Sequence, residues 1–407
     1  MRILFVSTLY PPIALGGYEV ECAGVVERLA ERHEVLVLTS SERRAEAGAE
    51  PRVCRELTLL TPDARGALRA PVAALAGAAA ARRALAFEPD LVYAWNCSSI
   101  PHAAVRVLAD SGVPLAFRVC EHWFGGLFGA DQFMRELLPA RRSPARAAWS
   151  AGCRALNAAT LRLRPLAPLR AAISWNSEAI ERMVPTPSFV EPVLERVCHS
   201  VPRYGDLYER VVRAPAADPE IVFLGRVMPY KGVGVAIEAL AKLHAGGRGS
   251  TRLVVIGPED EGYGAEMRAL VERLGVSAAV TWAGQRSPEE SAAALASAHA
   301  LIVPSVWDEP FPLVTIEAAL ARVPIVASDV GGIGEGMHDE EHALLFARGD
   351  ADGAARALER VLGEPAATAE RVERARLRAE EFRVGPYLDA QEQFVLDAHA
   401  ALTGPRA

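Results

Sequence analysis

The stretch that decides the fold is PSVWDEPFPLVTIEAALARVPIVASDVGGIGE, residues 304–335. It follows the apolar run 300–303, passes through a helical pattern and enters a second apolar run, 324–327, which ends in a glycine-rich turn. Short apolar runs that flank a helical segment predict two buried parallel strands joined by a helix. The stretch therefore indicates an α/β fold.

The same alternation extends outward in both directions. Strands are expected at 2–8, 34–39, 90–94, 114–119 and 170–174 in the first half and at 220–224, 252–256, 279–282, 300–303 and 324–327 in the second. Hydrophobic periodicity lapses over 202–220, which predicts a domain boundary. We expect two Rossmann-like β/α/β domains, residues 1–204 and 205–385, with an amphipathic helix at 386–401 that packs on the first.

Composition limits the function. The chain has 407 residues, a formal charge of −7 and 51% hydrophobic residues, and it shows no long basic stripe, which argues against nucleic-acid binding. The six cysteines are widely spaced and indicate reduced packing residues. No apolar run is long enough to span a bilayer and no signal-peptide core opens the chain, so we expect a cytoplasmic protein.

Two loops carry groups suited to an anionic ligand. Gly16 and Gly17 follow the first predicted strand, where glycines let backbone N–H groups approach an anion. Arg226 and Lys231 follow the strand 220–224, at the strand end where open α/β sheets bind ligands. The alternatives are a tight turn without ligand in the first loop and ordinary exposed cations in the second.

Two carboxylates occupy the deciding stretch. Glu309 falls in the loop after the strand 300–303, and Glu317 in the early turns of the next helix. Carboxylates accept hydrogen bonds from paired sugar hydroxyls and can stabilise positive charge near an anomeric centre. Alternatively, Glu317 interacts only with the helix dipole and Glu309 is a solvated acid. The Asp350-x-Asp352 pair precedes a helical pattern, so we interpret it as helix N-terminal acids rather than a metal site.

Taken together, these motifs resemble the retaining GT-B glycosyltransferases of family 4, the group 1 glycosyltransferases. The resemblance rests on the Gly-Gly loop, the G-R and K-G pairs, the E-P-F-x-L-V-x-x-E-A segment and the P-x-V-A-S-D-V-G-G turn, and it is most specific over 221–335. It implies two domains that face each other across a cleft, with a nucleoside-diphosphate sugar bound mainly by the second.

The resemblance also implies roles for individual residues. Arg226 and Lys231 would hold the donor diphosphate, Glu317 the ribose hydroxyls, and Glu309 would face the transferred sugar. The donor-binding set further includes Gly16, Gly17, Pro312, Leu313 and Val314. His122 matches the family histidine beside donor sugar and acceptor, the alternative being an ordinary half-buried histidine.

Three positions depart from the family pattern. Pro312 stands where the family has glycine, and it has no N–H to offer a phosphate. Arg322 stands where glycine caps the helix, at a cost of about 1 kcal/mol if the backbone is left-handed. His199-Ser200 replaces the familiar Asn-Gly, which leaves the role of that loop open.

The function implied is transfer of a hexosyl-type sugar from a nucleoside-diphosphate sugar, with a UDP-sugar favoured, to a hydroxyl of a carbohydrate, lipid-linked or small-molecule acceptor. We expect retention, with no cofactor and no metal. The alternatives are a non-catalytic binding protein on the same scaffold and a phosphorylase or synthase. The arginine-rich segment 134–170 allows peripheral contact with anionic membrane at the inner face, or helices that line an acceptor cleft.

Overall fold

The structure, a computed structural model, describes residues 1–13, 17–42, 50–60, 64–127 and 168–404. Side chains of 64–71 lie outside this description. The chain divides into two compact units, residues 1–198 with 387–407 and residues 199–386. The change between units thus comes slightly before residue 205, where periodicity lapses in the sequence. No helix among the described residues is both long and apolar enough to cross a membrane.

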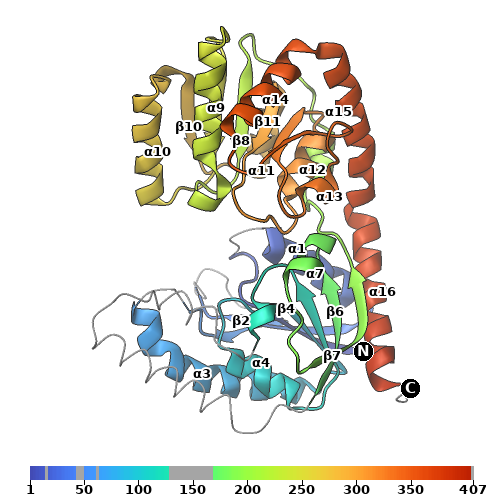
Figure 1. The fold of residues 1–407 in the computed structure, drawn as a ribbon. Coiled ribbons are helices and arrows are strands. Elements are labelled where there is room, and N and C mark those ends of the chain that lie inside the picture. Colours follow the sequence, from blue (N-terminus) through green and yellow to red (C-terminus); the bar gives the residue numbers. More distant parts are fainter. Residues whose placement is uncertain (14–16, 43–49, 61–63, 128–167, 405–407) are drawn as a thin grey trace. The chain divides into compact units, whose positions relative to one another are not determined.

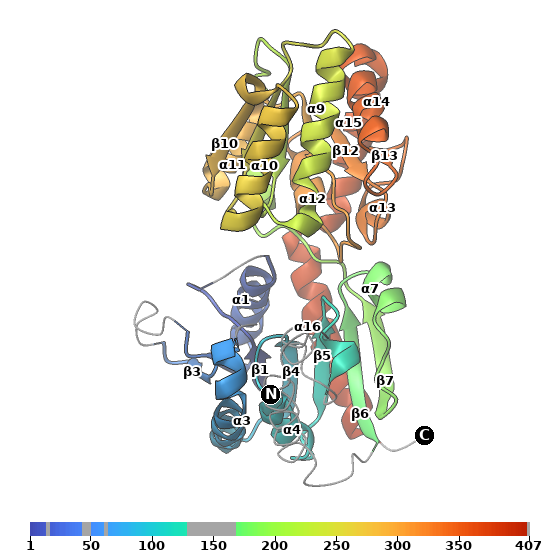
Figure 2. The same ribbon diagram turned by 60° about the vertical axis from the view of Figure 1, so that its left-hand side comes forward.

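The first unit is built on a seven-stranded parallel sheet (Figures 1 and 2). Its strand order is β3-β2-β1-β4-β5-β6-β7. The strands are β1 (Arg2–Ser7), β2 (Glu34–Ser40), β3 (Val53–Leu57), β4 (Leu91–Asn96), β5 (Leu115–Val119), β6 (Leu169–Trp175) and β7 (Val190–Val197). The helices are α1 (Gly17–Ala30), α3 (Ala64–Ala84), α4 (His102–Ala109), α7 (Glu178–Met183) and most of α16 (Val384–Thr403). Strands β1, β4 and β5 are almost wholly buried, which explains their continuous apolar sequence.

The second unit holds a six-stranded parallel sheet in the order β10-β9-β8-β11-β12-β13 (Figure 2). The strands are β8 (Glu220–Leu224), β9 (Arg252–Ile256), β10 (Val280–Gly284), β11 (Ala300–Val303), β12 (Ile325–Ser328) and β13 (Leu344–Phe346). Counted within the unit, this order is 3-2-1-4-5-6, that of a Rossmann fold. The order reverses between β8 and β11, so the loops that follow these two strands flank the point where such sheets bind ligands.

Helices cover the second sheet. They are α8 (Gly205–Glu209), α9 (Val233–Ala245), α10 (Glu261–Arg273), α11 (Pro288–Ser297), α12 (Leu313–Leu320), α13 (Ile333–Gly336), α14 (Ala351–Gly363) and α15 (Pro365–Ala379). Helix α9 packs beside α14 (Figures 1 and 2). Helix α12 packs against both α8 and α15. The predicted fold of two Rossmann-like units is therefore confirmed.

The C-terminal helix α16 contributes to the core of the first unit. Phe394 is fully buried and its ring lies 5.7 Å from that of Tyr93, whose hydroxyl donates to Oε1 of Gln391 at 2.9 Å. Arg28 on α1 also forms an ion pair with Glu392 on α16, at a distance of 3.1 Å. A buried aromatic side chain contributes about 1.5–3 kcal/mol, which ties the last helix to β4.

Candidate active site

The loops after β8 and β11 are joined by their backbones. The N–H of Val306 donates to the carbonyl of Tyr230 at 2.9 Å. Gly232 closes the first loop with φ of +69°, and a Cβ atom at this position would lie 1.9 Å from the carbonyl oxygen of Pro304. Because only glycine fits both the conformation and the space, this residue fixes how closely the two loops approach.

The predicted cation Lys231 meets the predicted acid Glu309 at this junction. The ammonium nitrogen lies 2.7 Å from Oε1 and 2.9 Å from Oε2 of the carboxylate, which also accepts a hydrogen bond from Ser305. Glu309 is 3% exposed, and the side chain of Lys231 is 22% exposed. Removing one partner of such a buried pair costs about 3–5 kcal/mol, so Glu309 holds Lys231 firmly in place.

Aromatic rings surround the same cation. The Lys231 nitrogen lies 5.8 Å from the ring centroid of Tyr230 and 5.7 Å from that of Trp307, and the two rings are 5.1 Å apart. The guanidinium of Arg226, an exposed residue, lies 5.6 Å from the Tyr230 ring. Both predicted phosphate-binding cations are therefore brought to one aromatic side chain, within the range of a cation–π interaction.

The start of α12 lies in the loop that follows β11. Pro312 is the N-cap residue with φ of −78°, which its ring favours, and its carbonyl accepts from both the backbone and the hydroxyl of Thr315. Leu313 and Val314 form the first turn, where backbone N–H groups have no acceptor within the helix. This end of α12 offers the positive pole of the helix dipole.

Glu317 lies one turn farther along α12 and is half-buried. Burial raises the pKa of its carboxyl to about 7, although a hydrogen bond from the hydroxyl of Tyr208 lowers it. Tyr208, on α8, is 3% exposed, and burial beside Glu317 raises its own pKa. The carboxyl thus lies at the edge of ionisation near neutral pH.

A glycine pair supports the backbone of Glu309 from the far side. The N–H of Gly332 donates to the Glu309 carbonyl at 2.7 Å. Gly331 has φ of +55°, and a Cβ there would lie 2.1 Å from the same carbonyl oxygen. The P-x-V-A-S-D-V-G-G motif is therefore a support for the acid-bearing loop.

His199 takes part in a separate contact within the second unit. Its Nε2 lies 2.5 Å from Oε1 of Glu335, and its ring packs on Phe311 and Phe382 at centroid distances of 5.1 and 5.7 Å. The departure from the family's Asn-Gly thus introduces a side chain that anchors α13.

Two of the first-unit candidates are among the described residues, and each follows a strand of the sheet. Gly17 is the exposed first residue of α1, which follows β1, whereas Gly16 lies outside the described residues. His122 is exposed in the turn after β5, so it is not the half-buried histidine of the alternative interpretation. Just before this turn, the buried guanidinium of Arg118 donates to Glu21 at 2.8 Å, which binds β5 to α1.

The remaining motifs have structural explanations. Asp350 caps α14 by accepting from the N–H of Gly353 at 2.9 Å, and Asp352 pairs with Lys242 at 2.6 Å, which confirms their interpretation as helix N-terminal acids. Arg322 has φ of +57° after the end of α12, as expected for a residue that replaces a capping glycine. The arginine-rich segment 134–170 lies almost entirely outside the described residues.

Sequence reasoning missed four side chains of this site. They are Tyr208, Tyr230, Ser305 and Trp307. Ser305 and Trp307 lie inside the deciding stretch, and Tyr230 adjoins Lys231. Their positions in the sequence, next to residues already chosen, could therefore have identified them. Tyr208 had none, because its contact with Glu317 depends on the packing of α8 against α12.

Known proteins resemble this chain in sequence. Residues 206–378 match the family model described as glycosyl transferases group 1. A glycogen synthase of Mycobacterium tuberculosis is 28% identical over 399 residues, which cover 93% of this chain and 90% of that protein. A D-inositol 3-phosphate glycosyltransferase of Rhodococcus opacus is 35% identical over 167 residues, 40% of this chain and 37% of that protein.

Solved structures share the fold over nearly the whole chain. Sucrose-phosphate synthase from Thermosynechococcus elongatus gives a TM-score of 0.73 at 20% identity, covering 98% of this chain and 99% of that one. Anabaena HepE in complex with UDP-glucose gives 0.66 at 19% identity, covering 98% and 100%. The fold class is thus GT-B. The chain is an enzyme of the glycosyltransferase class, and its residues 206–378 match the group 1 glycosyltransferases.

Proposed function

We propose that this enzyme moves a hexosyl-type sugar from a nucleoside-diphosphate sugar to a hydroxyl of its acceptor, with retention at the anomeric carbon. One observation carries the donor assignment: two cations and a helix N-terminus converge beside β8 and β11, where the strand order reverses. Anions are stabilised by this combination of charges and backbone N–H groups.

In this proposal Arg226 and Lys231 bind the diphosphate. An ammonium group has three N–H donors, and two of those of Lys231 are directed to Glu309. One donor therefore remains for a phosphate oxygen, while the carboxylate keeps the nitrogen in place. The exposed guanidinium of Arg226 can supply a second contact as negative charge grows on the leaving group.

The first turn of α12 supplies backbone contacts and Glu317 the ribose contact. The N–H groups of Leu313 and Val314 would bind phosphate oxygens, whereas Pro312 has none to give. An ionised Glu317 can accept hydrogen bonds from both ribose hydroxyls. We assign Glu309 a double task, holding Lys231 and accepting a hydroxyl of the donor sugar.

In the first unit, we assign Gly16 and Gly17 to the diphosphate and His122 to the reacting sugar and the acceptor. An exposed histidine in a strand-end turn is accessible to substrate and carries both a donor and an acceptor nitrogen. Replacement of His122 by alanine should lower kcat more than it weakens nucleotide binding.

UDP is the favoured nucleotide. Anabaena HepE was solved with UDP-glucose, and a further structural neighbour, from Escherichia coli, was solved bound with UDP-2-fluoro glucose. These structures share the fold with this chain, and a UDP-sugar is therefore the first donor to test. Carbohydrate, lipid-linked and small-molecule hydroxyls are the acceptor classes to offer.

The test is thermal unfolding against UDP, GDP, ADP, TDP and their sugars. A ligand at a hundred times its dissociation constant adds about 2.7 kcal/mol of stability. We expect one nucleotide to raise Tm, and this rise to disappear in Arg226→Ala and Glu317→Ala. The control is Arg252→Ala, an exposed residue at the opening of β9, away from the carboxyl ends of the strands. No rise with any nucleotide favours a non-catalytic scaffold.

Product analysis separates the remaining alternatives. A sugar phosphate as product identifies a phosphorylase, and a glycosylated acceptor identifies a transferase. An NMR spectrum of the product that shows an inverted anomeric centre would refute retention. Contact with anionic membrane and a cytoplasmic location stay predictions, which co-sedimentation with anionic vesicles and fractionation of cells test.

We also propose that transfer needs no metal, since cations already stand where the leaving diphosphate would lie. The proposal fails if EDTA abolishes turnover and manganese restores it. This experiment should be repeated in His338→Ala, because His338 lies in a separate cluster of metal-ligating side chains. Loss of a metal bound there would otherwise be mistaken for a catalytic requirement.

A further inference from the structure

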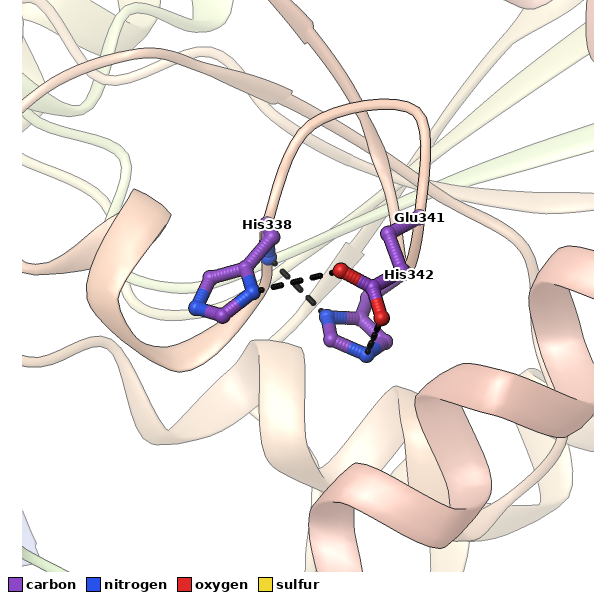
Figure 3. Close-up of side chains that lie close together, drawn as sticks. All are labelled: His338, Glu341 and His342. Atoms are coloured by element: carbon purple, nitrogen blue, oxygen red, sulfur yellow. Dashed lines mark hydrogen bonds and ion pairs between the residues drawn. The ribbon is translucent and has the colours of Figure 1, made fainter.

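A compact cluster of metal-ligating side chains lies outside the donor site. His338, Glu341 and His342 come from the loop that connects α13 to β13, and their side chains converge on one another (Figure 3). One ligand atom from each lies within 4.8 Å of the others. None of these residues belongs to the motifs that carry the resemblance or to the roles assigned above.

The spacing of the three side chains is close to that of a coordinated ion. His338 Nδ1 lies 3.5 Å from Oε2 of Glu341, and His342 Nε2 lies 3.6 Å from Oε1 (Figure 3). Zinc bonds to nitrogen and oxygen are about 2.0–2.2 Å long, so neighbouring ligand atoms of a tetrahedral site are about 3.4 Å apart. Each imidazole therefore already has one oxygen of the carboxylate at nearly the required distance.

We propose that His338, Glu341 and His342 bind a divalent transition metal, with Zn²⁺ as the first candidate. Two imidazoles and one carboxylate are ligands that Zn²⁺ accepts, whereas Mg²⁺ and Ca²⁺ prefer oxygen alone. Three protein ligands leave one position to water. The side chains of His338 and Glu341 are half-exposed and can move the small distance needed to coordinate the ion. His342 is only 8% exposed and fixes the position of the site.

The loop itself is held in shape before any ion binds. The backbone N–H of His342 donates to the carbonyl of His338 at 2.9 Å. Arg374 donates to the carbonyl of Glu341 at 2.9 Å, and Arg371 to that of Glu340 at 3.3 Å. The ligands are thus carried by a turn that α15 fastens from outside, which reduces the ordering that binding requires.

Metal binding would cost one hydrogen bond within the loop. Nδ1 of His342 accepts the backbone N–H of His338 at 3.2 Å, so the neutral ring carries its hydrogen on Nε2. Coordination through either nitrogen loses this contact: Nδ1 would bind the ion directly, or would take the hydrogen that leaves Nε2. The cost is a single long hydrogen bond, exchanged for a stronger metal–nitrogen bond.

The charged side chains around the cluster suggest an anion as the alternative ligand. Arg374 and Arg378 line the same depression, and both would repel a cation. Each guanidinium has its own carboxylate, Glu370 at 3.8 Å and Glu381 at 2.6 Å, so the lining is close to neutral rather than basic. An anion held by these arginines is therefore the alternative that the experiment has to separate from a metal.

The experiment is a calorimetric titration of the EDTA-treated, dialysed full-length chain with Zn²⁺. We expect one saturable equivalent in the micromolar range, weakened at least tenfold in His338→Ala and in Glu341→Gln, whose side chains are exposed enough to leave folding intact. His399→Gln is the matched control, a histidine on α16 outside the cluster, and it should bind as the wild type does.

Binding of Zn²⁺ that is unchanged in both cluster variants would overturn the proposal, as would an absence of saturation at about 1 mM Zn²⁺, roughly a thousandfold above the expected micromolar range. So would a Tm rise with sulfate instead of Zn²⁺ that is lost in Arg378→Gln, because the depression would then be an anion site. The readout is metal binding, so its outcome is independent of whether the proposed donor chemistry is correct.

Discussion

The role of Glu317 can be tested through the pH dependence of donor binding. Its carboxyl is half-buried on α12, and burial raises its pKa to about 7. If ribose hydroxyls bind to the carboxylate, only the ionised fraction of the enzyme is competent to bind. Lowering the pH through 7 should therefore weaken binding, in a range where an ordinary glutamate stays ionised.

The size of the effect follows from the ionised fraction. With a pKa of about 7, roughly 0.9 of the molecules carry the ionised carboxylate at pH 8 and roughly 0.1 at pH 6. The apparent dissociation constant scales inversely with the competent fraction, so it should rise about tenfold between pH 8 and pH 6. A tenfold change corresponds to about 1.4 kcal/mol of binding free energy.

The assay is titration calorimetry between pH 5.5 and 8.5 with the nucleotide sugar that gives the largest Tm shift. The sugar ester is preferable to a free nucleoside diphosphate, because a terminal phosphate has its own ionisation near pH 6. Tyr208→Phe should move the midpoint upward, since the hydrogen bond from Tyr208 lowers the Glu317 pKa. Glu317→Gln should bind weakly with a flat profile.

Two results would refute this reasoning. The first is a wild-type profile as flat as that of Glu317→Gln. The second is a similar tenfold slope in both proteins, which would place the ionisation on the ligand or on another residue. An unchanged midpoint in Tyr208→Phe would refute only the part of the reasoning in which Tyr208 lowers the Glu317 pKa.

Other predictions follow from single positions. Pro312→Gly supplies a backbone N–H at the helix start and should tighten nucleotide binding by about two- to tenfold, the value of one hydrogen bond; calorimetry that shows weaker binding contradicts this. Arg322→Gly removes a left-handed non-glycine residue and should raise the free energy of unfolding by about 1 kcal/mol in a urea titration, whereas Arg322→Ala should not. Arg118→Ala leaves Glu21 buried without its cation and should lose about 3–5 kcal/mol by the same measurement. Loss of the exposed ion pair between Arg2 and Glu88 should cost less than about 1 kcal/mol. If this loss equalled that of Arg118→Ala, the argument from the difference in burial would be contradicted.

The strands that the sequence left unassigned share one property. They are β3, β7 and β13, and each lies at an edge of its sheet. An edge strand can carry polar residues, as β3 and β7 do, whereas β13 is apolar but has only three residues. In β7, Pro192 and charged residues interrupt the pattern, and most of the strand is only partly buried. Central strands such as β4 were predictable because both of their faces are buried.

Some residues of the candidate site could be chosen from the sequence, but their contacts could not. Arg226, Lys231, Glu309 and Glu317 were chosen from motifs, and the structure brings Lys231 to Glu309 across 78 positions of sequence. That contact requires β8 and β11 to be neighbours, a property of strand order that local patterns do not contain. The Tyr208 contact likewise depends on helix packing.

The two carboxylates of the deciding stretch illustrate how environment divides similar groups between tasks. Glu309 is buried against Lys231 and Ser305, so its charge is compensated inside the protein and the pair can persist without a ligand. Glu317 accepts a hydrogen bond from the hydroxyl of Tyr208, and the pKa of its carboxyl is raised above the value in the unfolded chain. The stability that its protonated form contributes is present below the unfolded value of about 4.5 and is lost as pH rises through about 7. At pH 8 the free protein therefore carries a carboxylate whose charge is poorly compensated, and ligand hydroxyls that donate to it, as proposed above, would relieve this cost on binding. The acid that destabilises the unliganded unit is for that reason the one suited to recognise the donor, while the compensated acid is suited to keep Lys231 in position.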